Sequence, residues 1–409
     1  MSSRLSYLSS LSYTLAVIHC NAMFSSHASS VTHRRLKRAF LFPCIQGLQS
    51  ADVNLGTAIA AAGNRSDAGT YCPYTRNMSN VAIVQDGFNQ DDPLSTLKVV
   101  NKPIPKPAPG QVVVQIKLRP INPTDFITLR LGGIAQGGIC GSEGFGIVHE
   151  IGEGVKSVHK GQRVIPFTAY PSLSGHGSYQ KYVCLEEDFV WPVPDYISDE
   201  VAALFVVNPW ASYSIVKDLQ VPKGEYLLQS AAGSSLGKQV ITLAKHWGIK
   251  TINIVRRKEA VAELKALGAD EVIVSTEEDV VARVKEITGG KGAYGALDAI
   301  CGTMTKTIAA SVRDDGQVFL YGVLAGYDAT VSAIDLVFRR VDVKGWVLYT
   351  KAMNQSDRCQ AIAPEVAPLL RDGIIPVPKT VKYDLTDFKK AMAKAEEPGF
   401  AGKVLLVSE

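Results

Sequence analysis

Short apolar runs and amphipathic segments alternate through the second half of the chain. The apolar runs predict strands over residues 226–229, 251–255, 271–274, 296–300, 318–321 and 343–348. Between the first four of these runs, apolar residues at helical spacing predict helices over 238–247, 260–267 and 280–287. This regular alternation predicts an α/β domain over 206–349, in which helices cover both faces of a parallel sheet.

The first half has a different pattern, because its short apolar strands are separated by Gly-rich turns. This pattern predicts a small, curled β domain over 78–205. The tail, 350–409, adds helices over 361–370 and 386–395 and a closing strand over 402–407. We expect the tail to complete the β domain, which is then discontinuous in the chain.

Composition sets the N-terminal segment apart from the rest. Residues 1–77 are rich in Ser, Ala and Arg, carry seven Lys or Arg against two Asp, and show no sustained periodic pattern. This composition is typical of an organelle transit peptide, and we expect a mitochondrial location. The short apolar segment 8–18 leaves a plastid address open, and a start at Met78 would leave the protein in the cytosol.

Residues 1–77 carry a net charge of +5 against a total of +4, so the remaining chain carries −1 and is close to neutral. A near-neutral body gives no electrostatic reason to bind nucleic acid or an anionic membrane. No apolar run approaches the roughly 18 residues that a membrane span needs. The seven cysteines are scattered singly, which favours free thiols in a reducing compartment over a disulfide framework.

A cluster of small residues follows the strand over 226–229. It reads Ala231-Ala232-Gly233-Ser234-Ser235-Leu236-Gly237, and a helical pattern begins at once. This layout places bare backbone at a helix N-terminus, where N–H groups can bind a phosphate. The strict G-x-G-x-x-G is not met, because Ala232 and Ser234 occupy the first two glycine positions. An ordinary turn is the alternative, but the surrounding alternation favours a dinucleotide-binding fold.

The strand over 251–255 ends in Arg256-Arg257-Lys258. An NAD site carries an Asp or Glu about 20 residues after the glycines, where it holds the ribose 2′-hydroxyl. Cations at this position suit a 2′-phosphate instead, which an acid would repel. We therefore predict NADPH as the cofactor, with a solvated basic strand end as the alternative.

Metal ligands are scarce in this sequence. After residue 77 the chain contains four scattered histidines, which are His149, His159, His176 and His246. No Cys or His occurs over 122–125, and Ser142 occupies the position before Glu143. Because a zinc site needs a cluster of His and Cys ligands, the sequence predicts an enzyme without a metal.

Three segments carry a resemblance to a known family. They are Ile121-Asn122-Pro123-Thr124-Asp125, Gly141-Ser142-Glu143-Gly144 and Leu267-Gly268-Ala269-Asp270. With these motifs, residues 81–409 resemble the zinc-independent branch of the medium-chain dehydrogenase/reductase superfamily. Within that branch the chain is most similar to the mitochondrial 2-enoyl thioester reductases, near the quinone oxidoreductase-like proteins. The motifs behind this similarity are Val207-Asn208-Pro209, Thr251-Ile252-Asn253-Ile254-Val255-Arg256 and Lys344-Gly345-Trp346-Val347-Leu348.

The resemblance implies a fold and a set of NADPH contacts. The fold is a Rossmann-type doubly wound parallel sheet with a discontinuous GroES-like β-barrel domain, and the family is commonly a homodimer. The matching contact positions are Asn208, Gly233, Ser234, Ser235, Leu236, Arg256, Arg257, Lys258, Tyr321, Gly322, Val323, Leu324, Trp346, Val347, Leu348 and Lys403. Tyr321-Gly322 also follows a predicted strand, where an open α/β sheet holds its ligand. A role in core packing is an equally open interpretation of Trp346, and a solvated surface charge is an equally open interpretation of Lys403.

One position departs from the family pattern. The 2-enoyl thioester reductases carry a tyrosine shortly after the Asn-Pro element, as proton donor or carbonyl binder, and Gly133 stands in that slot here. The remaining catalytic candidates are Asn122, Thr124, Asp125, Tyr170 and Tyr179, each with a structural role as the alternative. Asp125 can equally be a buried hydrogen-bonding residue that fixes its turn, and water can supply the proton.

These observations together predict NADPH-dependent reduction of a carbon–carbon double bond conjugated to a carbonyl. The resemblance implies a 2-enoyl thioester of acyl-carrier protein or CoA as the preferred substrate. The protein's share is to orient the substrate and polarise its carbonyl, since the cofactor carries the difficult chemistry. A quinone or small alkenal is the alternative substrate, because its reduction asks less of a proton donor. A protein that binds NADPH without catalysis is the alternative of another class.

Overall fold

The computed structural model describes residues 79–409, apart from 133, 135–136, 170 and 349–354. These residues belong to one compact unit. The predicted leader and the two positions Gly133 and Tyr170 lie outside the described residues. No helix in the described part of the chain is both long and apolar enough to cross a membrane.

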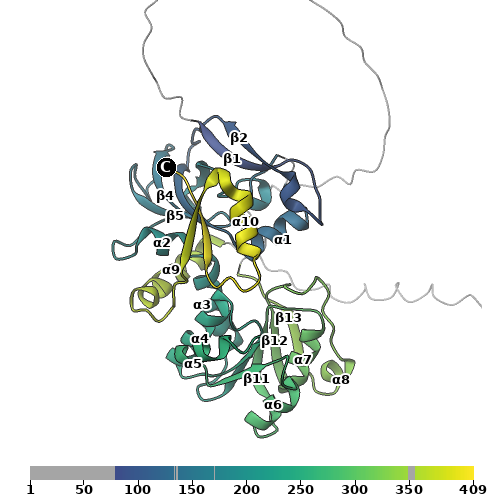
Figure 1. The fold of residues 1–409 in the computed structure, drawn as a ribbon. Helices are drawn as coiled ribbons and strands as arrows, with labels where there is room; N and C mark the ends of the chain where they lie inside the picture. Colours follow the sequence, from purple (N-terminus) through teal and green to yellow (C-terminus); the bar gives the residue numbers. More distant parts are fainter. Residues whose placement is uncertain (1–78, 133, 135–136, 170, 349–354) are drawn as a thin grey trace, which may run out of the picture. The chain divides into compact units, whose positions relative to one another are not determined.

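A six-stranded parallel sheet forms the α/β half of this unit (Figure 1). Its strand order is β10-β9-β8-β11-β12-β13, so the chain starts at the centre and winds outward in both directions. The strands are β8 (Tyr226–Gln229), β9 (Lys250–Val255), β10 (Glu271–Val274), β11 (Ala293–Asp298), β12 (Val312–Leu320) and β13 (Asp342–Gly345). This order is that of a doubly wound dinucleotide-binding sheet, as predicted.

Helices cover both faces of this sheet. Leu227 of β8 packs on one face with residues of two helices, α3 (Val207–Leu219) and α4 (Ser235–Trp247). Its neighbour Leu228 points to the opposite face, where it packs with α6 (Val280–Ile287) and α7 (Thr303–Ser311). Because successive side chains of a strand point to opposite faces, a fully apolar strand is buried on both sides. Helix α5 (Ala260–Leu267) packs on the α4 face.

The predicted strand over 343–348 is too long. The strand β13 ends at Gly345, and the indole Nε1 of Trp346 donates a 2.7 Å hydrogen bond to Asp218 in α3. Trp346 also packs against the core between the sheet and the helices α3 and α4. The residues that follow Gly345 are apolar because the chain leaves the sheet there and packs into this core.

The second half of the unit is a seven-stranded sheet, in which β6 pairs with β3 and the others follow the order β14-β15-β3-β4-β5-β7. Its strands are β3 (Gln111–Pro120), β4 (Phe145–Ile151), β5 (Arg163–Pro166), β6 (Tyr182–Glu186), β7 (Val190–Pro192), β14 (Thr380–Asp384) and β15 (Lys403–Val407). The closing strand β15 pairs antiparallel with β3, so the tail completes this half as predicted. The domain boundaries at 205/206 and 349/350 stay predictions.

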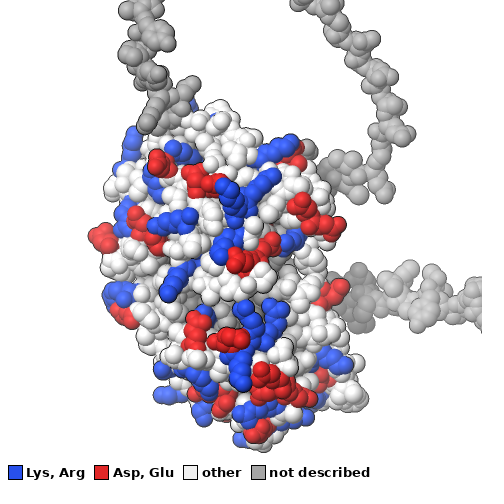
Figure 2. Space-filling model, in the orientation of Figure 1, with Lys and Arg blue, Asp and Glu red and all other residues white. Residues whose placement is uncertain are grey.

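The remaining elements flank these two sheets. A separate antiparallel hairpin consists of β1 (Asn80–Gln85) and β2 (Leu97–Lys102). The other helices are α1 (Pro123–Arg130), α2 (Asp199–Ala203), α8 (Ala333–Val337), α9 (Gln355–Arg371) and α10 (Phe388–Glu396). On the face drawn in Figure 2, Lys and Arg are interspersed with Asp and Glu, in keeping with the nearly neutral body.

A buried arginine ties the closing strand to β3. Arg119 is fully buried, and its Nη2 donates to the carbonyl of Ile116 and the hydroxyl of Ser408, both at 2.7 Å. Its Nη1 also donates to the carbonyl of Leu406. Burial lowers the pKa of Arg119 to about 9. These bonds fix the position of β15, which begins at Lys403.

Candidate active site

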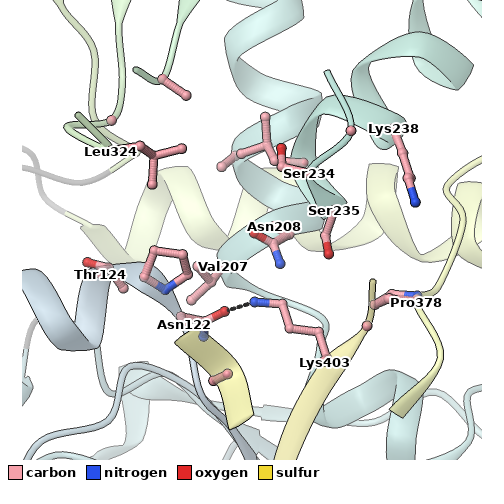
Figure 3. A pocket seen from close by; sticks show the side chains of 18 of the residues that line it. Asn122, Thr124, Val207, Asn208, Ser234, Ser235, Lys238, Leu324, Pro378 and Lys403 are labelled. Carbon is pink, nitrogen blue, oxygen red and sulfur yellow. Dashed lines mark hydrogen bonds between the residues drawn. The ribbon is translucent and has the colours of Figure 1, made fainter. Parts of the chain in front are cut away.

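A cavity of about 770 Å³ lies where the carboxyl ends of the parallel strands meet the β domain. The α/β half contributes the loop after β8, the segment after β12 and the start of α3. The β domain contributes the Asn122–Thr124 turn, the segment 376–379 and the start of β15. Figure 3 shows side chains from both halves pointing into this space.

Most residues that the sequence singled out line this cavity. They are Asn122, Thr124, Asn208, Gly233, Ser234, Ser235, Leu236, Tyr321, Gly322, Val323, Leu324, Trp346, Val347, Leu348 and Lys403. Asp125 and the basic segment Arg256–Lys258 do not line it. Tyr170 lies outside the described residues. Contact of any of these residues with a cofactor or a substrate stays a prediction.

The loop after β8 has the geometry of a phosphate-binding turn. The hydroxyl of Ser234 accepts a 3.0 Å hydrogen bond from the backbone N–H of Gly237 and so caps α4. A Cβ on Gly237 would lie 2.7 Å from the Cα of Ala232, so only glycine lets the helix approach the preceding loop this closely. Ser235 points into the cavity (Figure 3), and the N–H groups of this 13-residue helix begin there.

Sequence reasoning missed a lysine beside this turn. Lys238, in the first turn of α4, lines the cavity, and its Nζ lies 2.5 Å from the carboxylate of Glu263 in α5. Lys238 is four residues after Ser234 and three after Ser235, and this spacing places its side chain on the same side of the helix N-terminus as these serines. That spacing was the available signal.

The basic segment Arg256–Lys258 is exposed and directly follows β9. Since β8 and β9 are parallel neighbours, both run toward the same edge of the sheet, and the glycine turn follows β8 there. Ala260, at the start of α5, lies 4.0 Å from the point where a Cβ on Gly233 would stand. The segment is therefore outside the cavity wall but at the sheet edge where the glycine turn lies.

A network of buried polar side chains surrounds Asn122. The side-chain N–H₂ of Asn122 donates to Glu143 at 3.0 Å and to Ser142 at 3.3 Å, and its Oδ1 accepts a hydrogen bond from Nζ of Lys403. The other oxygen of Glu143 accepts from the backbone N–H groups of Val206 and Val207, at 3.0 and 2.8 Å. Glu143 thus joins the β domain to the N-terminus of α3, where a negative charge is favourable.

Burial opposes the charges in this network. It raises the pKa of Glu143 to about 7, raises the pKa of Asp125 and lowers the pKa of Lys403. Lys403 pulls both carboxyl pKa values back down, and the two carboxylates pull the lysine pKa back up. An uncharged Asn122 stands between the ammonium and Glu143, hydrogen-bonded to both.

Asp125 and Tyr179 form a pair behind the cavity wall. The carboxylate of Asp125 accepts hydrogen bonds from the backbone N–H of Asn122 at 2.8 Å and from the hydroxyl of Tyr179 at 2.9 Å. All three residues are buried. Asp125 therefore fixes the turn that presents Asn122 and Thr124, which is the structural alternative that the sequence left open.

Two family models match the chain. The description "Alcohol dehydrogenase GroES-like domain" matches residues 108–195, and "Zinc-binding dehydrogenase" matches 235–365. The mitochondrial enoyl-[acyl-carrier-protein] reductase of Caenorhabditis elegans is 32% identical over 332 residues, which cover 78% of this chain and 93% of that relative. The chain belongs to the medium-chain dehydrogenase/reductase superfamily. Among the described residues, no three His, Cys, Asp or Glu side chains come together as metal ligands would.

Solved structures of this superfamily share the fold. A quinone oxidoreductase of Pseudomonas syringae pv. Tomato superposes with a TM-score of 0.72 at 28% identity, over 81% of this chain and 100% of that chain. The quinone oxidoreductase of Escherichia coli, in complex with NADPH, gives 0.71 at 25% identity, with the same coverage. The predictions of a Rossmann-type sheet and a discontinuous GroES-like domain are confirmed.

Proposed function

We propose that this protein is an NADPH-dependent reductase of the carbon–carbon double bond of an α,β-unsaturated carbonyl, with a 2-enoyl thioester as its substrate. The observation that carries this proposal is the cavity, because one wall holds the glycine turn at the N-terminus of α4 and the facing wall presents polar side chains. The similarity to a mitochondrial enoyl-[acyl-carrier-protein] reductase over 93% of its length supports the substrate class.

The residues present fit the cofactor. The N-terminus of α4, with Ser235, would hold the pyrophosphate, and Arg256–Lys258 would pair with the 2′-phosphate. The segments 321–324 and 346–348 would hold the nicotinamide end. A Cβ on Gly322 would lie 2.7 Å from the carbonyl oxygen of Ala299, so the backbone turns tightly there. The buried hydroxyl of Tyr321 has no hydrogen-bond partner among the described residues. When bound, NADPH supplies a hydride.

The protein's own residues orient the substrate and shield it from water. Apolar residues of the cavity wall, among them Ile121, Val207 and Phe400, offer a surface for an acyl chain. Asn122 and Thr124 supply polar groups for the substrate on the β-domain side, and Lys403 lies beside them as the NADPH contact that the resemblance implies (Figure 3). A mostly apolar cavity with a few convergent polar groups is the usual form of a small-molecule site.

Consumption of NADPH tests the proposal. We expect the purified protein to oxidise NADPH with crotonyl-CoA and to release butyryl-CoA in equal amount. Tight binding of NADPH without turnover of crotonyl-CoA or of any quinone would favour the non-catalytic alternative instead.

A quinone or alkenal is the second candidate substrate. It is favoured by the superposition on quinone oxidoreductases at 25–28% identity and by Gly133 in the slot where the enoyl reductases carry tyrosine. The ratio of kcat/KM for crotonyl-CoA to that for a quinone decides between the two. A ratio well below one would make the quinone the substrate class.

We also propose a homodimer that pairs along β13. This strand is the edge of the six-stranded sheet, and an unpaired edge invites a partner strand. Large apolar side chains are exposed nearby, which are Leu324, Ile334, Val337 and, at 75% exposure, Phe338. Light scattering on the purified protein would detect the dimer, and Phe338→Glu should dissociate it.

We propose a mitochondrial enzyme that acts on acyl-carrier protein or CoA thioesters. The relative's name carries the mitochondrial location and the carrier-protein substrate. The composition of residues 1–77 agrees with the same address. The plastid and cytosolic alternatives find no support in that name. Imaging of the full chain fused to a fluorescent protein tests the location.

A further inference from the structure

Lys238 brings a positive charge to the cavity wall beside the glycine turn. Its backbone N–H donates to the carbonyl of Ser234 at 3.0 Å, which places the residue in the first turn of α4. Figure 3 shows the side chains of Lys238 and Ser235 extending from this helix toward the same space. The first turn of α4 contains no Asp or Glu. The helix dipole and the ammonium therefore act together there to attract an anion.

The ammonium of Lys238 has donors to offer a ligand. Among the described residues, the carboxylate of Glu263 is the one acceptor that Nζ reaches, at 2.5 Å. An ammonium carries three donors. The side chain of Glu263 is 55% exposed and that of Lys238 is 18% exposed, so the carboxylate lies largely in water. Such an ion pair contributes little to stability, and Lys238 can therefore leave it for a stronger anion.

A segment of the β domain lies across the cavity from Lys238. The side-chain N–H₂ of Gln239, the next residue of α4, donates to the carbonyl of Pro376 at 3.3 Å. This hydrogen bond holds segment 376–379 against the start of the helix, and Figure 3 shows Lys238 directed toward Pro378. A ligand at the N-terminus of α4 would be enclosed between the helix and this segment. Partial exclusion of water strengthens a hydrogen bond between charged groups.

We propose that Lys238 binds the pyrophosphate of the dinucleotide and leaves Glu263 to do so. This inference rests on the proposed function and adds one residue to its cofactor site. A pyrophosphate carries two negative charges and accepts charge-assisted hydrogen bonds, whereas Glu263 offers one charge that water already solvates. Glu263 then competes with the cofactor for the ammonium. Because NADPH and NADH share the pyrophosphate, Lys238 contributes equally to the binding of both.

The variant Lys238→Met tests this role, with Lys245→Met as its matched control. Methionine keeps the apolar stem without the charge, and Lys245 is exposed at the other end of the same helix and does not line the cavity. We expect Lys238→Met to weaken NADPH about 10-fold or more, and NADH by the same factor, because a charge-assisted hydrogen bond is lost. Lys245→Met should keep the wild-type affinities. Fluorescence titration of the full chain with each cofactor, without substrate, measures them.

Two further variants separate cofactor binding from a structural ion pair. Glu263→Gln removes the competing carboxylate, so we expect it to bind NADPH more tightly than the wild-type protein. Lys238→Arg retains the positive charge and should retain most of the affinity. An ion pair that only holds α4 and α5 together predicts the opposite for Glu263→Gln, which would then weaken NADPH as Lys238→Met does. Melting curves check that each variant is folded.

Failure of this inference is distinguishable from failure of the proposed function. A wild-type protein that does not bind NADPH would refute the cofactor of the proposed function. If the wild-type protein binds NADPH and Lys238→Met binds it with the same affinity, the inference alone is wrong. A loss confined to NADPH would also overturn it, because Lys238 would then bind the 2′-phosphate. Equal losses in Lys238→Met and Glu263→Gln would identify a structural ion pair instead.

Discussion

Glu143 Oε2 lies 2.8 Å from the backbone nitrogen of Val207, the first residue of α3. The same carboxyl group accepts a hydrogen bond from Asn122, which in turn accepts one from Lys403. One side chain of the β domain therefore caps a helix of the α/β half and orients the polar groups of the cavity. This connection makes the geometry of the site depend on the contact between the two halves.

The titration of Glu143 predicts a pH dependence of stability. Burial raises its pKa from 4.5 to about 7, so the folded protein holds a proton that the unfolded chain releases. The free energy of unfolding should therefore fall as pH rises from about 4.5 to about 7, by about 3 kcal/mol from this group. Glu143→Gln cannot titrate and should lose this part of the slope. Urea unfolding of both proteins across that range is the measurement, and identical slopes would contradict it.

The clamp at Arg119 predicts a large loss of stability. Arg119→Met removes the donors for the carbonyl of Ile116 and the hydroxyl of Ser408, which stay buried. Hydrogen bonds to charged groups contribute about 1.5–3 kcal/mol each, so we expect a loss of about 3 kcal/mol or more. The control is Arg340→Met, whose surface ion pair with Asp315 should contribute less than about 1 kcal/mol. Equal effects of the two variants in urea unfolding would speak against the clamp.

The basic segment after β9 predicts cofactor preference. Arg256→Ala should weaken NADPH about 10-fold or more, because a charge-assisted bond to the 2′-phosphate is lost, while NADH affinity stays within a few-fold. Arg283→Ala, a half-buried arginine on α6 that does not line the cavity, is the matched control. Fluorescence titration with both cofactors measures the effect. Should NADPH and NADH lose affinity equally, Arg256 is not the 2′-phosphate partner.

The tight packing around Gly237 predicts that one added methyl group destabilises the protein. In Gly237→Ala the new Cβ would stand 2.7 Å from both Cα and the carbonyl oxygen of Ala232, so the start of α4 must shift. We expect a loss of about 1–3 kcal/mol in stability and weaker NADPH binding. Gly345→Ala, at a position with nothing within 4 Å, should change neither. A Gly237→Ala protein with wild-type stability and cofactor affinity would contradict this packing argument.

The sequence predicted the parts of the fold that depend on local pattern. The strands β8 and β10 and the helices α5 and α6 have the predicted bounds, because each combines a clean period with a clear stop such as Gly268 or Gly289. Helix α3 was not predicted. Most of its residues are buried, so it lacks the polar face from which an amphipathic helix is recognised.

The site was predictable where one segment forms it and not where distant segments meet. The glycine turn and the Asn122–Thr124 turn are local, and both line the cavity. The hydrogen bond between Lys403 and Asn122 joins residues 281 positions apart, and it exists because β15 pairs with β3. Pairing between strands so far apart leaves no signal in local periodicity. The same holds for Glu143, because the backbone N–H groups that it binds at the start of α3 belong to the other half of the unit.

The most direct test of the account is the reduction of crotonyl-CoA with NADPH in heavy water, with the product analysed by mass spectrometry and NMR. We predict butyryl-CoA that carries one deuterium, at the α-carbon, and none at the β-carbon, because the hydride comes from the cofactor and the proton from solvent. Deuterium at the β-carbon, or no butyryl-CoA while a quinone is reduced, would contradict the account.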